Sequence, residues 1–174
     1  MKKYIRILAL ALVAALALCA CGQSDEDKQK AAEAAAAAEA AKPVPVPAPT
    51  ADKAAWQKYL TNVVTRNMQG VKTNSPFMYY VPAGESSDIL DARNSQLNSV
   101  SDAVARGVLP GNMMAFGGPD SKATGDLVVD GFSKARDGTF KGVVILFVGA
   151  TADQARVKDA VAKSGAEFRF VEMK

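Results

Sequence analysis

The sequence of 174 residues predicts an α/β fold, a small three-layer sandwich in which helices cover a mostly parallel, four-stranded sheet. From residue 51 onward, helical and strand patterns alternate along the chain, an order typical of parallel sheets with right-handed crossovers. Residues 143–148 are continuously apolar, as expected for a central strand covered on both faces. Residues 167–172 alternate Phe168 and Phe170 with other residues, mostly charged, which is typical of a strand with one solvated face.

The first helix is expected over residues 56–68, because large apolar side chains recur there at spacings of three and four. Phe77 to Val81 is aromatic and apolar and lies between two prolines, which indicates a strand. Asp88 is placed to cap a second helix that ends near Gly107. The apolar face of that second helix would consist of Leu90, Leu97, Val100 and Val104.

Residues 112–116 predict the second strand, which ends at a Gly-Gly pair, and Pro119 suits the first turn of a third helix. Residues 126–136 leave two interpretations open. Gly125 and Gly131 each weaken a helix by up to about 1 kcal/mol, and a following Asp-Gly pair is also typical of a turn between two strands.

The last helix of the predicted domain is expected between the apolar strand and the final strand. Thr151 followed by Gln154 has the spacing of a capping box, which opens a helix. Gly165 would end that helix. We therefore expect one globular domain over residues 51–174, which is within the usual size range of an independently folding unit.

The amino terminus has the pattern of an export signal. Three basic residues precede an apolar run over residues 7–20, which is shorter than the roughly 20 residues that a membrane-spanning helix needs. The run ends in Leu-Cys-Ala-Cys-Gly at residues 18–22, which resembles the lipobox of bacterial lipoproteins. The resemblance implies that residues 1–20 are a signal peptide and that Cys21 carries the lipid. The alternative is an ordinary secretory signal with an incidental cysteine.

The resemblance also implies a location and an anchor. In Gram-negative lipoproteins, Gly22 rather than Asp after the cysteine implies sorting to the outer membrane, with the domain facing the periplasm. Acyl chains on Cys21 would hold the protein firmly on the membrane, because a second chain makes such an anchor stable. Removal of residues 1–20 also takes away Cys19, and acylation consumes Cys21, so the mature domain would have no free thiol.

The charge balance of the mature chain argues against nucleic acid as a partner. Three of the 21 basic residues lie in the signal segment, which leaves 18 basic against 18 acidic residues. A nearly neutral chain lacks the positive field with which proteins attract phosphate backbones.

Residues 21–50 are expected to be a spacer between the anchor and the domain. Residues 25–42 are mostly Ala, Glu, Lys and Asp with no large apolar residue, so a helix there has no face to bury. Residues 43–49 have proline at alternate positions, which favours an extended polyproline II conformation. The alternative for this segment is a proline-rich ligand or an arm that crosses the peptidoglycan.

The residue inventory excludes several kinds of catalysis. The chain has no histidine, and the mature form would have no cysteine, so Ser-His-Asp and Cys-His catalysis and the common zinc sites are excluded. No Walker phosphate loop, Gly-x-Gly-x-x-Gly or Ser-x-x-Lys motif occurs. We therefore expect no metal, no cofactor and no enzymatic activity, with carboxylate-dependent catalysis as the remaining enzyme alternative.

Two Gly/Ser-containing loops, residues 82–87 and 117–122, follow the first two predicted strands and precede helices. In a parallel sheet they emerge at the carboxyl ends of the strands, where ligands bind and where free amides at helix starts can hold an anion. The alternative is that the glycines form turns and the polar residues cap helices. The candidate ligand-binding residues are Gly84, Ser86, Ser87, Gly117, Gly118, Ser121 and Lys122.

The function predicted from these observations is that of a membrane-anchored envelope lipoprotein whose domain binds a protein partner. It would be an accessory component of an envelope or secretion assembly, or a protective inhibitor. A long spacer, a neutral surface and the lack of a catalytic motif favour this interpretation. The second hypothesis is a domain that binds a small molecule or an anion through the two loops.

Overall fold

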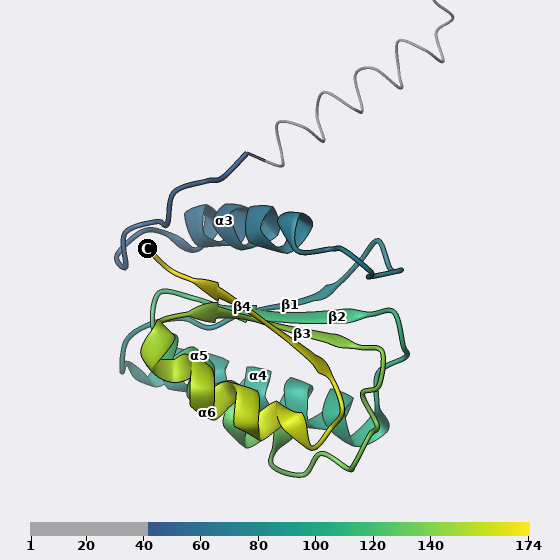
Figure 1. The fold of residues 1–174 in the computed structure, drawn as a ribbon. Coiled ribbons are helices and arrows are strands. Elements are labelled where there is room, and N and C mark those ends of the chain that lie inside the picture. The colour runs from purple at the N-terminus through teal and green to yellow at the C-terminus, as the bar shows by residue number, and fades with distance from the viewer. Residues whose placement is uncertain (1–41) are drawn as a thin grey trace, which may run out of the picture. The chain divides into compact units, whose positions relative to one another are not determined.

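The computed structural model describes residues 42–174, in which helices and strands alternate as predicted (Figure 1). Residues 1–41, with the predicted signal peptide, Cys21 and most of the spacer, lie outside the described residues. No helix between residues 42 and 174 combines the length and apolar character needed to cross a bilayer. The elements are α3 (Lys53–Arg66), β1 (Phe77–Tyr80), α4 (Ser87–Arg106), β2 (Met113–Gly117), α5 (Ser121–Phe132), β3 (Val144–Gly149), α6 (Thr151–Ala162) and β4 (Glu167–Glu172).

The four strands form one parallel sheet in the order β1-β2-β3-β4, which confirms the predicted α/β class. Each crossover leads to the neighbouring strand, so the strand order never reverses. Every residue of β2 and β3 is buried, as expected for the interior strands. The expected strand at residues 143–148 is therefore confirmed as a central one.

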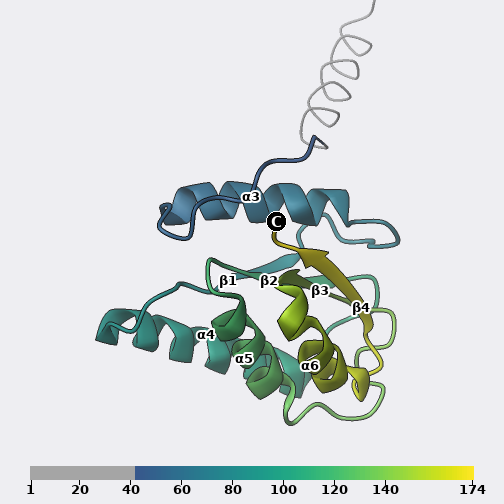
Figure 2. The same ribbon diagram turned by 60° about the vertical axis from the view of Figure 1, so that its left-hand side comes forward.

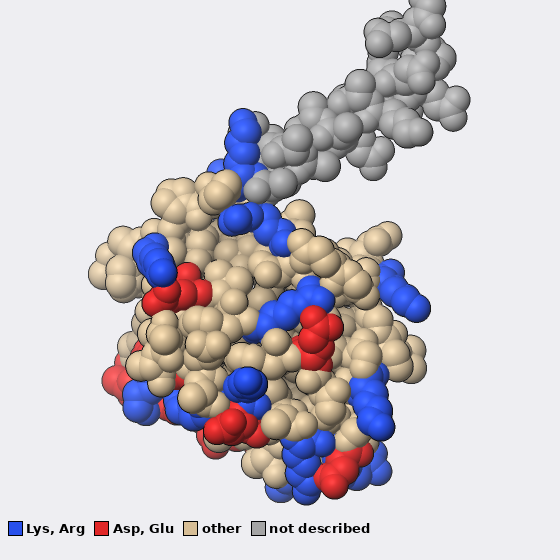
Figure 3. All heavy atoms as spheres, viewed as in Figure 1, with Lys and Arg blue, Asp and Glu red and all other residues tan. Residues whose placement is uncertain are grey.

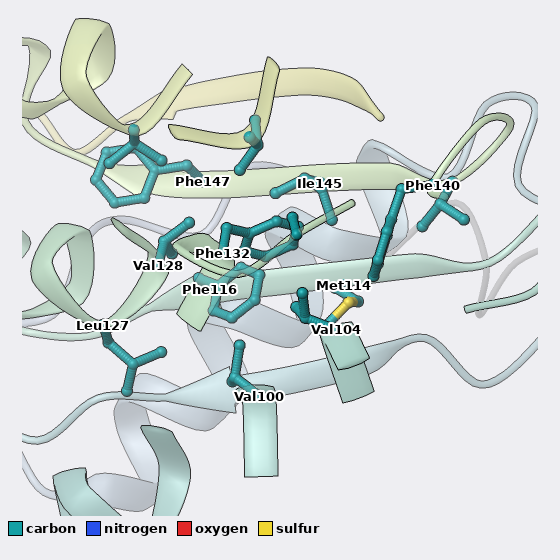
Figure 4. Close-up of a cluster of buried hydrophobic side chains, with 14 of the residues drawn as sticks. Val100, Val104, Met114, Phe116, Leu127, Val128, Phe132, Phe140, Ile145 and Phe147 are labelled. Carbon is teal, nitrogen blue, oxygen red and sulfur yellow. The ribbon is translucent and has the colours of Figure 1, made fainter. Parts of the chain in front are cut away.

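Helices cover both faces of the sheet, which gives the three layers that the sequence predicts (Figure 1). The crossover helices α4, α5 and α6 lie on one face, where apolar side chains form the larger core (Figure 4). Its aromatic centre links Phe116 to Phe132, with ring centroids 6.5 Å apart, and Phe132 to Phe140, at 5.3 Å. Residues 121–132 are thus a helix, and both Gly125 and Gly131 are accommodated within it.

A single helix, α3, covers the other face, with Trp56 and Leu60 buried against Met113, Leu146 and their neighbours. A helix is about 10 Å wide, whereas four strands spaced about 4.8 Å apart extend over roughly 14 Å between their outer axes. One helix therefore leaves part of this face to be covered by other segments. The partly buried residues packed against this core are Val44, Val46, Ala51, Met68, Val71, Tyr80, Val171 and Met173, of which Tyr80 and Val171 belong to the sheet itself.

Two of these residues belong to the proline-rich segment, which packs on the domain instead of extending freely from it (Figure 2). The Asn62 side chain donates to the Lys42 carbonyl and accepts from the Val44 amide, and the Trp56 indole donates to the Ala48 carbonyl. Packing with the domain thus begins before residue 51, where the sequence placed the boundary. The physical reason is the uncovered apolar surface beside α3.

Three details of the helix starts differ from the predictions. Ser86, not Asp88, is the N-cap residue of α4, and Asp88 lies in the first turn. Asp120 caps α5 by accepting a hydrogen bond from Ala123, so Pro119 precedes the helix instead of lying in its first turn. The capping box predicted for α6 is wrong.

In α6, Thr151 is the first helical residue, and its hydroxyl donates to the Glu172 carboxylate of β4 at 2.6 Å. The N-cap residue is Ala150, which has no side chain that can cap. On α4, Leu90 is 40% exposed and does not belong to the buried face predicted for it. The first turns of α4 extend past the body of the sheet (Figure 2).

Candidate functional site

The two predicted loops lie at the same end of the sheet, because they follow the adjacent parallel strands β1 and β2. Arg93 of α4 connects them. Its Nε donates to the Pro82 carbonyl at 2.8 Å, and its guanidinium lies 3.7 Å from Glu85 and 3.8 Å from Asp120. No sequence pattern indicated this role for Arg93, which lies on the face of α4 that packs against the domain.

The glycines of the second loop are required by close packing. A Cβ atom on Gly118 would lie 2.0 Å from the carbonyl oxygen of Val81, and one on Gly117 would lie 2.4 Å from the Leu60 side chain. Both glycines are buried. They let the chain leave β2 close to the end of β1, and they leave no open space beside their backbone on these sides.

Ser121 does not face a free ligand site. Its hydroxyl donates to the Asp153 carboxylate at 2.5 Å and accepts from the Ala150 amide at 2.7 Å. It therefore joins the start of α5 to the start of α6. This contact supplies a partner for the amide of Ala150, the N-cap residue of α6.

Ion pairs extend this network along α5 and α6. Arg156 lies 2.7 Å from Asp126 and 2.8 Å from Asp153, and it also donates to the Lys122 carbonyl at 2.9 Å. Lys122 pairs with Asp126 at 2.9 Å. Burial acts to raise the pKa of Asp126, but hydrogen bonds from Lys122 and Arg156 outweigh this effect and hold its pKa below the ordinary value of 3.8. The carboxylate is thus ionised at neutral pH.

Acidic side chains already occupy the helix starts at this end of the sheet. Asp120 is the N-cap of α5, Asp153 lies in the first turn of α6, and Asp88 lies in the first turn of α4. A carboxylate at a helix start satisfies the amide donors and the dipole that would otherwise attract an anion. An incoming anion would have to displace these groups or share the helix starts with them.

The first loop is open but offers few directed groups. Gly84, Ser86 and Ser87 are all exposed, and Gly84 has φ +113°, a conformation that suits glycine. Ser86 makes no side-chain capping hydrogen bond. The Ser87 hydroxyl reaches the neighbouring Asp88 at 3.5 Å.

The hollow nearest the loops lies between α4 and α5 and has a volume of about 160 Å³. Small-molecule sites usually enclose roughly 300–1,000 Å³. Arg93, Asp126 and Asp130 line it, and the first two are engaged in the ion pairs described above. Among residues 42–174, no three acidic side chains come together in the way that metal binding needs.

A different surface is exposed at the outer edge of β1. Within the described chain β1 pairs with β2 alone, and its first two side chains, Phe77 and Met78, are 46% and 39% exposed. The later two are held in the fold, because Tyr79 stacks on Phe116 with ring centroids 4.9 Å apart and Tyr80 packs on the α3 side. Within residues 42–174, the edge thus presents apolar side chains and backbone groups that pair with no second strand, while the carbonyl of Tyr80 accepts a hydrogen bond from the Gln96 side chain of α4.

A groove of about 410 Å³ runs beside this edge, between α3 and the segment that leads into β1. The Thr61 hydroxyl contacts the Met78 sulfur at 4.0 Å across it. The groove is lined by Thr61, Val64, Thr65, Met68, Asn74, Pro76 and Met78. None of these side chains carries a charge. We refer to the outer edge of β1 and this groove together as the β1 surface.

The opposite edge of the sheet has a different character. On β4, Glu167 is exposed, and Arg169 donates to the Glu167 carboxylate and to the carbonyl of Gln69. Charged side chains are a common means by which natural proteins prevent edge strands from pairing with other chains. Residues 73–82, around β1, contain no charged residue. This difference is visible in the sequence and is the signal that would have identified the β1 surface.

The rest of the surface carries no field of one sign on the side seen in Figure 3, where basic and acidic residues are interspersed. Comparison with models of known protein families, with curated proteins and with solved structures finds no match for this chain. The features that bear on function are therefore those of its own residues. Among residues 42–174, they are an exposed first loop with few directed groups, a second loop closed by internal contacts, and the uncharged edge at β1.

Proposed function

We propose that the chain is a membrane-anchored envelope lipoprotein whose domain binds a protein partner through the β1 surface. The observation that carries the proposal is the uncharged edge strand, which within residues 42–174 pairs with β2 alone and exposes Phe77 and Met78 beside an uncharged groove. An extended segment of a partner can add a strand to such an edge, with backbone hydrogen bonds giving affinity and side-chain pockets giving specificity.

The chemistry of the β1 surface defines the expected partner segment. It is an extended stretch of uncharged residues, with an apolar side chain positioned for the groove between Val64, Met68 and Met78. Loss of water from this surface supplies the main driving force, since the groove has no ion-pairing group. Two roles fit a protein that binds such a partner. One is an accessory subunit of an envelope or secretion assembly. The other is an inhibitor that blocks the partner by binding its extended segment.

The loops after β1 and β2 support a small-molecule or anion ligand less well. Ser121 is held by Asp153 and Ala150, and Asp120 caps α5. Lys122 is exposed but pairs with Asp126. A protein partner at the β1 surface requires none of these contacts to break.

Site-specific photo-crosslinking in cells tests the proposal. We expect a photoreactive phenylalanine analogue at Phe77 to form an adduct with the partner. The same analogue at Leu109, which is 77% exposed but lies in the segment between α4 and β2, should form none. Met78→Lys should lower the adduct yield by about tenfold, because a hydrated charge at the edge opposes pairing.

The position of the control makes the result specific. Adducts in equal yield from positions 77 and 109, or a yield unchanged by Met78→Lys, would contradict the β1 surface as the interface. An adduct of twice the chain's mass would identify the partner as a second copy.

A further inference from the structure

The second feature that suggests a function of its own is the segment of residues 42–48, which lies along one side of α3 (Figure 2). Val44 and Val46 are half-buried against the α3 core, whereas Pro43 and Pro45 are exposed. Residues 43–46 thus alternate between exposed and half-buried, as in an extended peptide bound along one of its sides, while farther along Pro47 is half-buried and Ala48 is exposed.

Asn62 recognises the backbone of this segment. It is 8% exposed, in the middle of α3, and its Nδ2 donates to the Lys42 carbonyl at 2.8 Å while its Oδ1 accepts from the Val44 amide at 3.3 Å. An asparagine side chain offers one acceptor and two donor hydrogens, so it can pair with a carbonyl and an amide two residues apart. The contact requires a residue other than proline at position 44, because proline has no amide hydrogen.

Trp56 supplies a second contact one and a half turns earlier on α3. Its indole N–H, which can only donate, lies 3.2 Å from the Ala48 carbonyl, and its ring is 1% exposed in the core. Asn62 and Trp56 therefore hold the two ends of the segment. Both contacts are made to backbone atoms.

The segment itself is stiffened for binding. Lys42, Val44, Val46 and Ala48 each precede a proline, which restricts them to extended conformations, and each proline fixes its own φ. Ordering such a peptide costs less conformational entropy than ordering a flexible one. Because proline has no amide hydrogen, the proline positions of the segment have no backbone donor that needs a hydrogen-bond partner.

These contacts resemble those of a bound ligand more than those of a core element. The anchoring interactions are polar, and only Val44 and Val46 bring apolar side chains to the site. If the segment leaves, Asn62 becomes accessible to water and is not stranded as a buried, unpaired amide. The strands and α3 keep their own hydrogen bonds.

We propose that Asn62 and Trp56 form a peptide-binding site for extended segments with proline at alternate positions, and that residues 42–48 occupy it reversibly in cis. The site's ligand has the form Lys-Pro-Val-Pro-Val-Pro-Ala, in which the two valines face the protein. This part of the proposal rests on the membrane anchor proposed above. While residues 42–48 occupy the site, they do not contribute to the length of the spacer between the anchor and the domain. Release adds seven residues, or about 20 Å of reach at roughly 3.1 Å per residue.

Hydrogen exchange on a chain of residues 22–174, which contains the whole described domain, tests the site. The Val44 amide should exchange about tenfold or more slowly than in a free peptide of residues 42–49, yet faster than the amides of β3, because release does not require global unfolding. Asn62→Ala should bring Val44 to the free-peptide rate and leave β3 protected. Asn67→Ala is the matched control, since its side chain bonds to the Val63 carbonyl and not to the segment.

Peptide binding in trans gives an independent measurement. In a chain with Val44→Asp and Val46→Asp, the cis segment should leave, and a fluorescent peptide with the native sequence of residues 42–49 should bind. Adding Asn62→Ala should weaken that binding by about tenfold, as expected for loss of hydrogen bonds worth near 1.4 kcal/mol. Fluorescence anisotropy follows it.

Three results would overturn the proposal. In the first, the Val44 amide exchanges only together with the β3 amides, which would make the segment a permanent part of the core. In the second, it exchanges at the free-peptide rate in the unmodified chain, which would mean that the site does not hold it. In the third, the peptide fails to bind a Val44→Asp, Val46→Asp chain whose β3 amides remain protected. None of these measurements involves the β1 surface or a partner.

Discussion

At the scale of single residues, the candidate loop residues have structural roles that the sequence could only state as an alternative. Gly117 and Gly118 permit a close approach between chain segments, and Ser121 joins two helix starts. The types of these residues were compatible with an anion site or with turns and caps. The choice between the two depended on neighbours such as Val81 and Asp153, which are distant in sequence.

Gly118→Ala is expected to destabilise the domain by about 3 kcal/mol or more. Its new Cβ would lie 2.0 Å from the Val81 carbonyl oxygen, and backbone atoms cannot move aside as a flexible side chain can. Urea unfolding followed by the emission of the buried Trp56 measures the change.

Gly107→Ala provides the comparison. Gly107 has φ +82° and ψ 159°, a conformation open essentially to glycine alone, but a methyl group on its Cα would have no neighbouring atom within 4 Å, so conformational strain of about 1–3 kcal/mol is expected without a steric clash. Equal losses for the two variants would contradict the steric explanation for Gly118.

At the scale of elements, the sequence predicted the four strands and the helices α3, α4 and α6 of the described residues, left residues 126–136 open between helix and strand, and misassigned residues at the starts of α4, α5 and α6. Apolar periodicity identified α3, and continuous apolarity identified β3, because both patterns follow from burial. Capping depends on which of several adjacent polar residues has the right backbone geometry. The Thr151 hydroxyl bonds instead to Glu172, a partner on another element.

The link between α5 and α6 predicts a modest acid dependence of stability. The pKa of Asp126 is lowered in the folded protein, so above its ordinary value of 3.8 the ionised carboxylate contributes its full stabilisation. As the pH falls through the folded pKa, the proton that binds removes this contribution. Asp126→Asn should therefore cost less than about 1 kcal/mol at neutral pH, since Asp126 is partly exposed.

The difference in unfolding free energy between Asp126→Asn and the unmodified protein should shrink as the pH is lowered below 3.8. Urea unfolding at a series of pH values measures it. Asp130→Asn is the control on the same helix, because Asp130 is exposed and makes no side-chain ion pair described for this domain. A pH-independent difference for Asp126→Asn would show that its ion pairs do not contribute to stability.

At the scale of the whole molecule, the sequence predicted a mostly parallel sheet between layers of helices, but not which helices lie on which face of the sheet. Within residues 42–174, crossovers between neighbouring strands place α4, α5 and α6 on one face, whereas α3 covers the other. From its sequence, the proline-rich segment that helps cover the α3 face resembled a free spacer, because its apolar residues do not recur at the spacing of a helix. Its pattern of period two matched a bound extended peptide equally well.

The two edges of the sheet also differ in a way that only the strand order reveals. β4 carries charges, and β1 does not, but edge strands are known only once the strand order is known. The uncharged stretch around β1 is visible in the sequence, but only the strand order shows that it belongs to an edge of the sheet, where we propose the interface. If the chain is anchored as we propose, the spacer brings this surface to partners near the membrane.

The anchor itself leads to the last prediction, Cys21→Ser. Cys21 lies outside the described residues, and its role rests on the lipobox resemblance of residues 18–22. The thiol is the only acyl acceptor that this resemblance provides, so the variant should take up no fatty-acid analogue. It should be found as an uncleaved precursor or in the soluble fraction. Metabolic labelling followed by cell fractionation measures both properties.

Cys19→Ser is the matched control, because it removes the neighbouring thiol but keeps Leu three residues before Cys21 and Ala directly before it. This variant should be labelled and membrane-bound like the unmodified protein, since a lipid anchor depends on acyl chains and not on Cys19. Label retained by Cys21→Ser, or lost from Cys19→Ser, would overturn the assignment of the anchor.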